Sequence, residues 1–169
     1  MDKDTKKCIS IAEKPSTFGV TFHNQGYSVL GINYSYIPLK IMPSQLETII
    51  EIVRNNFHGC SVSMPHKIEV MKYLDKLDYS ADRVGAVNTI LNKDGRLIGY
   101  NSDYYGAKKA IESKLDIKEK DVVMIGAGGV ARAIGYAVND LAGILTITNR
   151  TEQKAKDLAS ISNASTIPF

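Results

Sequence analysis

The chain has 169 residues, a length that fits one ordinary domain or two small ones. Its 21 lysines and arginines against 18 acidic residues leave a formal charge of +3, spread along the chain without basic runs, which argues against a nucleic-acid platform. No apolar stretch is long enough for a signal peptide or a membrane span, and the two cysteines lack zinc-ligand spacing. We therefore expect a cytoplasmic protein without membrane anchor, disulfide or metal.

Strands and helices are predicted to alternate over the first hundred residues. In chain order they are a strand over residues 7–12, a helix over 20–30, strands over 32–39 and 60–62, a helix over 66–74, and a hairpin of 86–91 with 97–100. A further helix follows Pro43, where Ser44 and Glu47 have the spacing of a capping box. Its apolar residues recur at helical spacing and are Leu46, Ile49, Ile50 and Val53.

A second alternating pattern follows a predicted helix over residues 102–114 and a polar linker. It comprises strands over 121–125 and 144–148 and helices over 129–141 and 152–160, and the chain ends where a third strand should begin. Such alternation predicts an α/β fold with mostly parallel sheet and functional groups at the carboxyl ends of the strands. We expect a substrate-binding domain over residues 1–103 and a partial Rossmann-like domain over 104–169.

A glycine-rich turn joins the strand over 121–125 to the next helix. It matches the dinucleotide-binding fingerprint and consists of Gly126, Ala127, Gly128, Gly129, Val130 and Ala131. The first glycine permits a tight turn, the second lets the backbone approach a pyrophosphate, and the helix N-terminus attracts the anion. Glycines in this pattern also allow close helix–strand packing without a ligand, and that alternative stays open.

The second strand of this pattern ends in Asn149, Arg150 and Thr151. A site that prefers NAD usually carries an acidic residue here to bind the ribose 2′-hydroxyl. A guanidinium instead forms paired hydrogen bonds with a 2′-phosphate, so Arg150 favours NADP as the cofactor. A solvated arginine at a helix start is the alternative.

Two polar residues of the first half stand out. Lys67 follows a run of small hydroxyls and a proline, at the predicted start of a helix where a cation is unfavourable unless it meets an anion. Asn88 lies inside an apolar predicted strand, where its amide must form hydrogen bonds or cost a few kcal/mol. Both residues are candidates for a binding site.

Five motifs in order, SVSMPHK, GAVNTI, GYNSDYYG, GAGGVARAI and NRT, resemble the shikimate dehydrogenase family over nearly the whole chain. The resemblance implies an N-terminal substrate domain, an NADP domain and reversible reduction of 3-dehydroshikimate to shikimate, a step towards aromatic amino acids. It also implies that Lys67 and Asp103 are the catalytic pair and that Asn88 binds a substrate hydroxyl. The alternatives are a surface cation for Lys67, a helix N-cap for Asp103 and a structural hydrogen bond for Asn88.

The sequence departs from the family pattern in the loop that binds the substrate carboxylate. Alignment on His23-Asn24 places Thr17 and Gly19 where the family has serines, so one hydroxyl is lost. Ser63 stands in place of a family threonine. Both changes resemble quinate-using relatives, so quinate is an alternative substrate. The family-like histidines are expected to be structural.

The chain is also shorter than family members by roughly a hundred residues. The resemblance therefore leaves two further readings open: a piece of a longer enzyme, or a remnant that binds a small molecule without turnover. The exposed edge of a partial nucleotide-binding sheet leaves a homodimer open as well.

Overall fold

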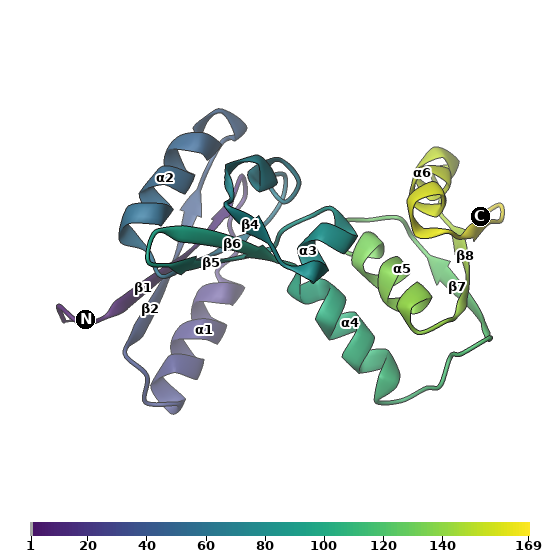
Figure 1. The fold of residues 1–169 in the computed structure, drawn as a ribbon, viewed down its shortest axis with the longest axis horizontal. Coiled ribbons are helices and arrows are strands. Elements are labelled where there is room, and N and C mark those ends of the chain that lie inside the picture. The colour runs from purple at the N-terminus through teal and green to yellow at the C-terminus, as the bar shows by residue number, and fades with distance from the viewer. Residues whose placement is uncertain (1) are drawn as a thin grey trace. The chain divides into compact units, whose positions relative to one another are not determined.

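The computed structural model describes residues 2–169 as an α/β protein, which confirms the fold class expected from the sequence. Contacts divide it into two compact units, one ending at Tyr100 and the other running from Asn101 to Phe169. Each unit has its own sheet with helices packed against it (Figure 1). None of the helices over residues 2–169 is both long and apolar enough to cross a bilayer.

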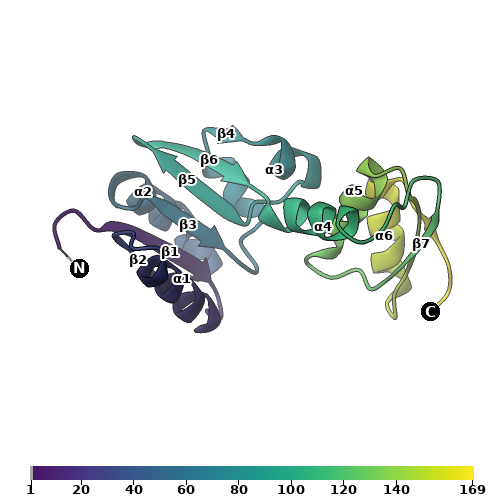
Figure 2. The same cartoon turned by 90° about the horizontal axis from the view of Figure 1, so that it is seen from below.

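The first unit contains a six-stranded mixed sheet in the order β2-β1-β3-β5-β6-β4, which Figure 2 shows from below. Its strands are β1 (Lys6–Ala12), β2 (Tyr34–Lys40), β3 (Gly59–Val62), β4 (Lys76–Leu77), β5 (Thr89–Lys93) and β6 (Arg96–Tyr100). β1 is parallel to both β2 and β3, and β5 is antiparallel to both β3 and β6. The carboxyl ends of β1 and β3 therefore meet at one edge of the unit.

Two helices cover opposite sides of this sheet, α1 (Phe18–Val29) and α2 (Leu46–Asn56), as Figure 1 shows. The apolar face predicted for α2 is confirmed, because Leu46, Ile49, Ile50 and Val53 are all buried. They pack in one core cluster with residues of β1, β3, β5 and β6. The short helix α3 (Tyr79–Val84) and strand β4 are elements that the sequence pattern did not reveal.

The capping box predicted for Ser44 and Glu47 is wrong. The turn after Pro43 is a 3-10 helix, η1 (Pro43–Gln45), and it leads directly into α2. Gln45 takes the reciprocal role, since its side-chain oxygen accepts the backbone N–H of Met42 at 2.9 Å. The residue that caps the first turn is therefore Gln45, two positions before the predicted Glu47.

The α-helix predicted over residues 66–74 is also wrong, because that segment forms a turn followed by a 3-10 helix, η2 (Glu69–Tyr73). In an α-helix the carbonyl of Lys67 would accept the N–H of Met71. It accepts the N–H of Val87 at 2.7 Å instead, and Met71 donates to Ile68. The tertiary hydrogen bond thus interrupts the helical pattern.

The hairpin of β5 and β6 is confirmed, with Asp94 and Gly95 at its turn. Both have positive φ, 54° and 85°, as a two-residue type I′ turn requires. Asn92 connects this hairpin to α2. Its amide nitrogen contacts the carbonyls of Val53, Arg54 and Phe57 at 2.8–3.1 Å, and its oxygen accepts the N–H of Gly95. One side chain therefore satisfies the last carbonyls of a helix and closes a turn.

Arg54 reinforces the same junction. Its guanidinium contacts a carboxylate oxygen of Asp75 at 2.5 Å and donates to the carbonyls of Gly95 and Tyr73. The hydrogen bond from Arg54 lowers the pKa of the Asp75 carboxyl, so this contribution to stability is present above the ordinary pKa of an aspartate and is lost as the pH falls through the lowered value.

The two cysteines project to opposite faces of the sheet. Cys8 in β1 lies opposite Gly59 of β3, and Cys60 lies opposite Ile9, one residue further along each strand. Burial raises the pKa of the Cys60 thiol far above its usual value, which keeps it a protonated core residue.

The second unit contains a parallel three-stranded sheet in the order β7-β8-β9. Its elements are α4 (Ser102–Glu112), β7 (Asp121–Ile125), α5 (Ala131–Asp140), β8 (Ile144–Thr148), α6 (Glu152–Ser162) and β9 (Ser165–Thr166). The strands and helices predicted here are confirmed, apart from one or two residues at their ends, and β9 supplies the third strand. β8 contributes Leu145 and Ile147 to a separate core with α5 and α6.

We expect Asn92→Ala to lower the free energy of unfolding by about 2 kcal/mol or more, because the partly buried carbonyls at the end of α2 lose the donor that Asn92 supplies. Urea unfolding followed by circular dichroism measures this change. Asn55→Ala is the matched control, since its exposed amide bonds only to the carbonyl of Glu51 in its own helix. Equal effects of the two substitutions would contradict the role of Asn92.

Candidate functional site

The carboxyl end of β3 brings two of the predicted substrate ligands together. The N–H of Val62 donates to the carbonyl of Asn88 at 2.8 Å, and the N–H of Asn88 donates to the carbonyl of Tyr100 at 3.0 Å. Ser63 follows directly, and its own N–H donates to the carbonyl of Ile11 in β1 at 2.9 Å. Backbone hydrogen bonds therefore fix Ser63 and Asn88 at the same edge of the sheet.

The sequence pattern placed Asn88 inside a strand, but the residue lies one position before β5. Its backbone nevertheless continues the ladder, and its side chain is half-buried at the end of the sheet. The side-chain oxygen accepts the hydroxyl of Thr89 at 3.0 Å. The amide is thus held in a defined orientation beside Ser63.

Lys67 is held at this edge by its backbone. Its carbonyl accepts the N–H of Val87, which precedes Asn88. The segment before it is anchored by His66, which is 1% exposed and donates from Nε2 to the carbonyl of Ile41 at 2.8 Å. Because Lys67 does not begin an α-helix, the helix-dipole argument made for it does not apply. Its position beside Asn88 now supports the functional interpretation.

Thr17 lies at the amino end of α1, five residues after β1 ends. It is exposed, and its side chain makes no capping hydrogen bond to the helix. A Cβ added to Gly19 would lie 3.5 Å from Cε1 of Tyr36, an ordinary contact distance. A serine would therefore fit at position 19, and its missing hydroxyl is not explained by crowding.

The family-like histidines have the structural roles expected for them. His66 is the buried anchor described above, and His23 stacks on Tyr36 with ring centroids 4.3 Å apart. Burial lowers the pKa of His23, which favours the neutral ring. Its neighbour Asn24 forms two hydrogen bonds of 2.9 Å with the backbone of Tyr36, which secures α1 to β2.

Asp103 occupies the first turn of α4 in the second unit. The N-cap of this helix is Asn101, whose side-chain oxygen accepts the N–H of Tyr104 at 3.1 Å. The N-cap alternative considered for Asp103 is therefore wrong. Tyr104 is buried and donates its hydroxyl to Asp140 of α5 at 2.6 Å, so α4 is fixed on its own unit.

The glycine turn lies between β7 and α5, as its motif requires. Gly126 has φ of 112°, a conformation that L side chains rarely adopt, and its N–H donates to the carbonyl of Thr148 at 2.7 Å. A Cβ on Gly126 or on Gly128 would meet no atom within 4 Å. The turn is thus tight and has open space beside it for a ligand.

Asn149 braces this turn from the end of β8. Its side-chain oxygen accepts the N–H of Ala127 at 3.2 Å, and its nitrogen donates to the carbonyl of Thr151 at 2.8 Å. The predicted cofactor residue therefore has a positioning role within the protein. Arg150 and Thr151 beside it are exposed.

The sequence analysis missed two polar groups near the turn. The Nε of Arg132 and the hydroxyl of Thr148 are buried and have no hydrogen-bond partner among residues 2–169. Arg132 lies in the first turn of α5, where a cation is unfavourable without an anion. A cation near the start of a predicted helix, the signal used for Lys67, also marks Arg132 in the sequence.

The structure thus brings Ser63, Lys67 and Asn88 together in the first unit, and the glycine turn and Asn149 together in the second. Lys67 and Asp103 belong to different units, so their pairing stays a prediction. No group of three or more metal-binding side chains is found within residues 2–169.

Residues 16–90 match the family model described as the shikimate dehydrogenase substrate binding domain. The NADP(+) shikimate dehydrogenase of Methanocaldococcus jannaschii is 41% identical over 145 residues, which cover 85% of this chain and 51% of that protein. The Listeria monocytogenes shikimate 5-dehydrogenase, solved with shikimate and NAD, matches with a TM-score of 0.88 at 33% identity, over 100% of this chain and 62% of that one.

The 5-ketofructose reductase of a Gluconobacter strain has the same fold, with a TM-score of 0.86 at 30% identity over 99% of this chain and 63% of that one. These likenesses show that the chain shares its two-unit α/β fold with a shikimate 5-dehydrogenase and a 5-ketofructose reductase. The chain is therefore similar to the shikimate dehydrogenase family, whose substrate binding domain its residues 16–90 match. It spans about half the length of the curated relatives that it matches.

We expect Asn149→Ala to speed hydrogen exchange at the amide of Ala127, because that N–H loses its acceptor. Exchange followed by NMR measures the effect. Gln153→Ala is the control, since its side chain bonds only to the neighbouring Asp157 on the surface of α6. An unchanged exchange rate at Ala127 would show that Asn149 does not brace the turn.

Proposed function

We propose that this protein is an NADP-dependent oxidoreductase that interconverts 3-dehydroshikimate and shikimate in the cytoplasm, on the route to aromatic amino acids. The observation that carries the proposal is the convergence of Ser63, Lys67 and Asn88 at the carboxyl end of β3, within the residues that match the substrate binding domain. The relatives named for NADP(+) and shikimate support the cofactor and the substrate.

In this proposal the first unit binds substrate and the second binds NADP. The residues present fit the cofactor: the glycine turn has open space beside it, and the orphaned Nε of Arg132 offers a donor to a phosphate. The cofactor would be held by the turn from Gly126 to Ala131 and by Arg150 and Thr151, with Asn149 bracing the turn. Arg150 would bind the 2′-phosphate and Arg132 the pyrophosphate that both nucleotides share.

The proposed chemistry requires a proton donor at the substrate ketone. When bound, the reduced cofactor supplies the hydride to the carbonyl carbon. Lys67 gives its proton to the carbonyl oxygen as the alcohol forms, and then takes a proton from water. The carboxylate of Asp103 would stabilise the charged ammonium, and Asn88 would orient the ring through a hydroxyl. Thr17 and Ser63 would bind the substrate carboxylate.

Quinate is a second candidate substrate. Quinate corresponds to shikimate with water added across the ring double bond, so its carboxylate-bearing carbon is tetrahedral and carries an additional hydroxyl. Quinate therefore needs more room at that end. Position 19 offers that room, because Gly19 has no side chain beside Tyr36. Ser63 is also smaller than the threonine that it replaces in the family pattern.

A third candidate is binding without turnover. It is favoured by the family match, which lies within the first unit and covers only the substrate binding domain, at residues 16–90. Such a protein would bind shikimate or quinate and leave NADP unreduced. The assay below separates the three candidates.

The 169-residue chain should reduce NADP when shikimate is supplied, and Lys67→Ala should lower kcat by about a hundredfold or more because the proton donor is lost. The absorbance of NADPH measures turnover with shikimate and with quinate, and calorimetry measures binding of each. Lys72→Ala is the matched control, since Lys72 is an exposed lysine of η2 paired with Glu69. We expect the control to match the unmodified chain.

The outcomes are distinct. Faster turnover of quinate than of shikimate would transfer the proposal to quinate. Binding of either acid without turnover would support the third candidate. If the chain shows no binding and no turnover with either acid, the proposed function is overturned. Equal activity of Lys67→Ala and Lys72→Ala would remove the lysine from the mechanism.

Arginine substitutions test the cofactor assignment by binding alone. Arg150→Asp should weaken the binding of NADP far more than the binding of NAD, because only NADP carries the 2′-phosphate. Arg132→Gln should weaken the binding of both nucleotides by a similar factor, because both carry the pyrophosphate. Fluorescence titration with each nucleotide measures the dissociation constants. Equal losses of NADP and NAD in Arg150→Asp would contradict the role of Arg150, and unchanged affinities in Arg132→Gln would contradict that of Arg132.

A further inference from the structure

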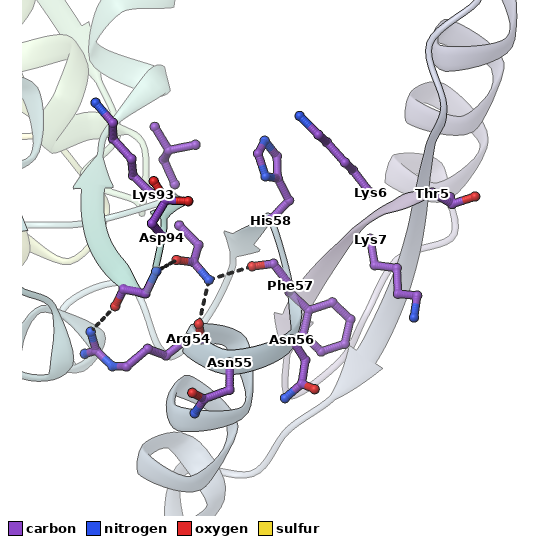
Figure 3. Close-up of a pocket in the computed structure, with 13 residues that line it drawn as sticks. Thr5, Lys6, Lys7, Arg54, Asn55, Asn56, Phe57, His58, Lys93 and Asp94 are labelled. Atoms are coloured by element: carbon purple, nitrogen blue, oxygen red, sulfur yellow. Dashed lines mark hydrogen bonds between the residues drawn. The ribbon is translucent and has the colours of Figure 1, made fainter. Parts of the chain in front are cut away.

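A hollow of about 580 Å³ lies at the end of the first unit where β1 and β3 begin. Its walls are residues 5–7 at the start of β1, residues 54–58 at the end of α2, and residues 91–95 at the hairpin turn (Figure 3). Ser63 follows the opposite end of β3. The hollow is therefore separate from the proposed substrate site.

The walls carry an excess of positive charge. Three lysines line the hollow, Lys6, Lys7 and Lys93, together with His58, and Asp94 is the single acidic residue among the lining side chains. The guanidinium of Arg54 does not add to this charge, because it pairs with Asp75 and Glu51. None of the three lysines has an ion pair within residues 2–169.

The side chains of Lys6, His58 and Lys93 lie on one side of the hollow, while Lys7 extends to the other, as Figure 3 shows. The ring of Tyr34 positions two of them: the ammonium of Lys6 lies 5.6 Å from its centroid, and the His58 ring meets it edge-on at 5.4 Å. The arrangement is thus supported by packing and is not a set of independent surface side chains.

The backbone fixes the spacing of the same residues. His58 donates its N–H to the carbonyl of Lys7 at 2.8 Å, and its carbonyl accepts the N–H of Asn92 at 3.0 Å. His58 therefore sits between the start of β1 and the end of β5, with Lys6 on one side and Lys93 on the other. Neighbouring like charges repel one another, and an anion between them relieves the repulsion.

We propose that this hollow binds a small polyphosphate anion, with Lys6 and Lys93 engaging separate phosphate groups and His58 donating a hydrogen bond between them. A polyvalent ligand is required because the two ammonium groups come from different strands, on either side of the imidazole. Lysine suits phosphate as a point charge with three donors. The site is open, so its ligand binds through charge and not through apolar burial.

Titration of the 169-residue chain with tripolyphosphate tests the proposal, with the ring protons of His58 followed by NMR and affinity measured by calorimetry. We expect saturable shifts of the His58 signals and an affinity that falls about tenfold or more in the Lys6→Gln, Lys93→Gln double variant. Raising the salt from about 50 to about 200 mM should weaken binding, because the charges are exposed. Inorganic phosphate should bind more weakly than tripolyphosphate.

The Lys109→Gln, Lys114→Gln double variant is the control, because it removes the same charge from exposed positions of the second unit. It should bind tripolyphosphate within about twofold of the unmodified chain. Equal weakening in both double variants, or unmoved His58 signals, would overturn the site. Equal affinity for phosphate and tripolyphosphate would overturn the proposal that the ligand carries more than one phosphate group. Binding at the glycine turn is distinguished because it leaves His58 unaffected.

Discussion

The main chain of Asn88 is hydrogen-bonded on both sides, to Val62 at the end of β3 and to Tyr100 at the end of β6. This double pairing is possible because β5 runs antiparallel between its two neighbours. It places an amide side chain next to Ser63, and the adjacent N–H of Val87 holds the carbonyl of Lys67. Without this ladder, Asn88 would have no fixed position relative to Ser63 and Lys67, which come from an earlier segment of the chain.

The sequence predicted those features whose cause is local. Apolar residues at helical spacing identified α2, and a glycine fingerprint between a strand and a helix identified the nucleotide-type turn. It failed where a distant group takes over a backbone hydrogen bond. The N–H of Val87 competes for the carbonyl of Lys67 and converts a predicted α-helix into a turn and η2. No pattern within residues 66–74 could have revealed that competitor.

Some roles of polar side chains could also be predicted from a sequence motif, and others are apparent only in the folded structure. Asn149 was selected for its place in a cofactor motif, yet its amide also holds the turn itself together. Asn92 carries no motif, although it satisfies carbonyls at the end of α2 and closes the hairpin. The role of such an asparagine is visible only after the helix end and the turn have been placed together, because its partners at the helix end lie 35 to 39 positions away in sequence. Arg132 differs, since its position in a helix's first turn was a readable signal.

The likeness to both a shikimate dehydrogenase and a 5-ketofructose reductase bears on where specificity lies. Reduction of any ketone needs a hydride donor and a proton donor, so a lysine fixed at the end of β3 suits more than one substrate. Discrimination must then come from groups that contact the remainder of the ring. In the proposed site those groups would stand at the start of α1 and just after β3, where Gly19 and Ser63 have smaller side chains than the family pattern. A buried polar substrate group without a partner costs more than a missing methyl contact, so under the proposed function the number of hydroxyls at these positions would set the preference between related acids.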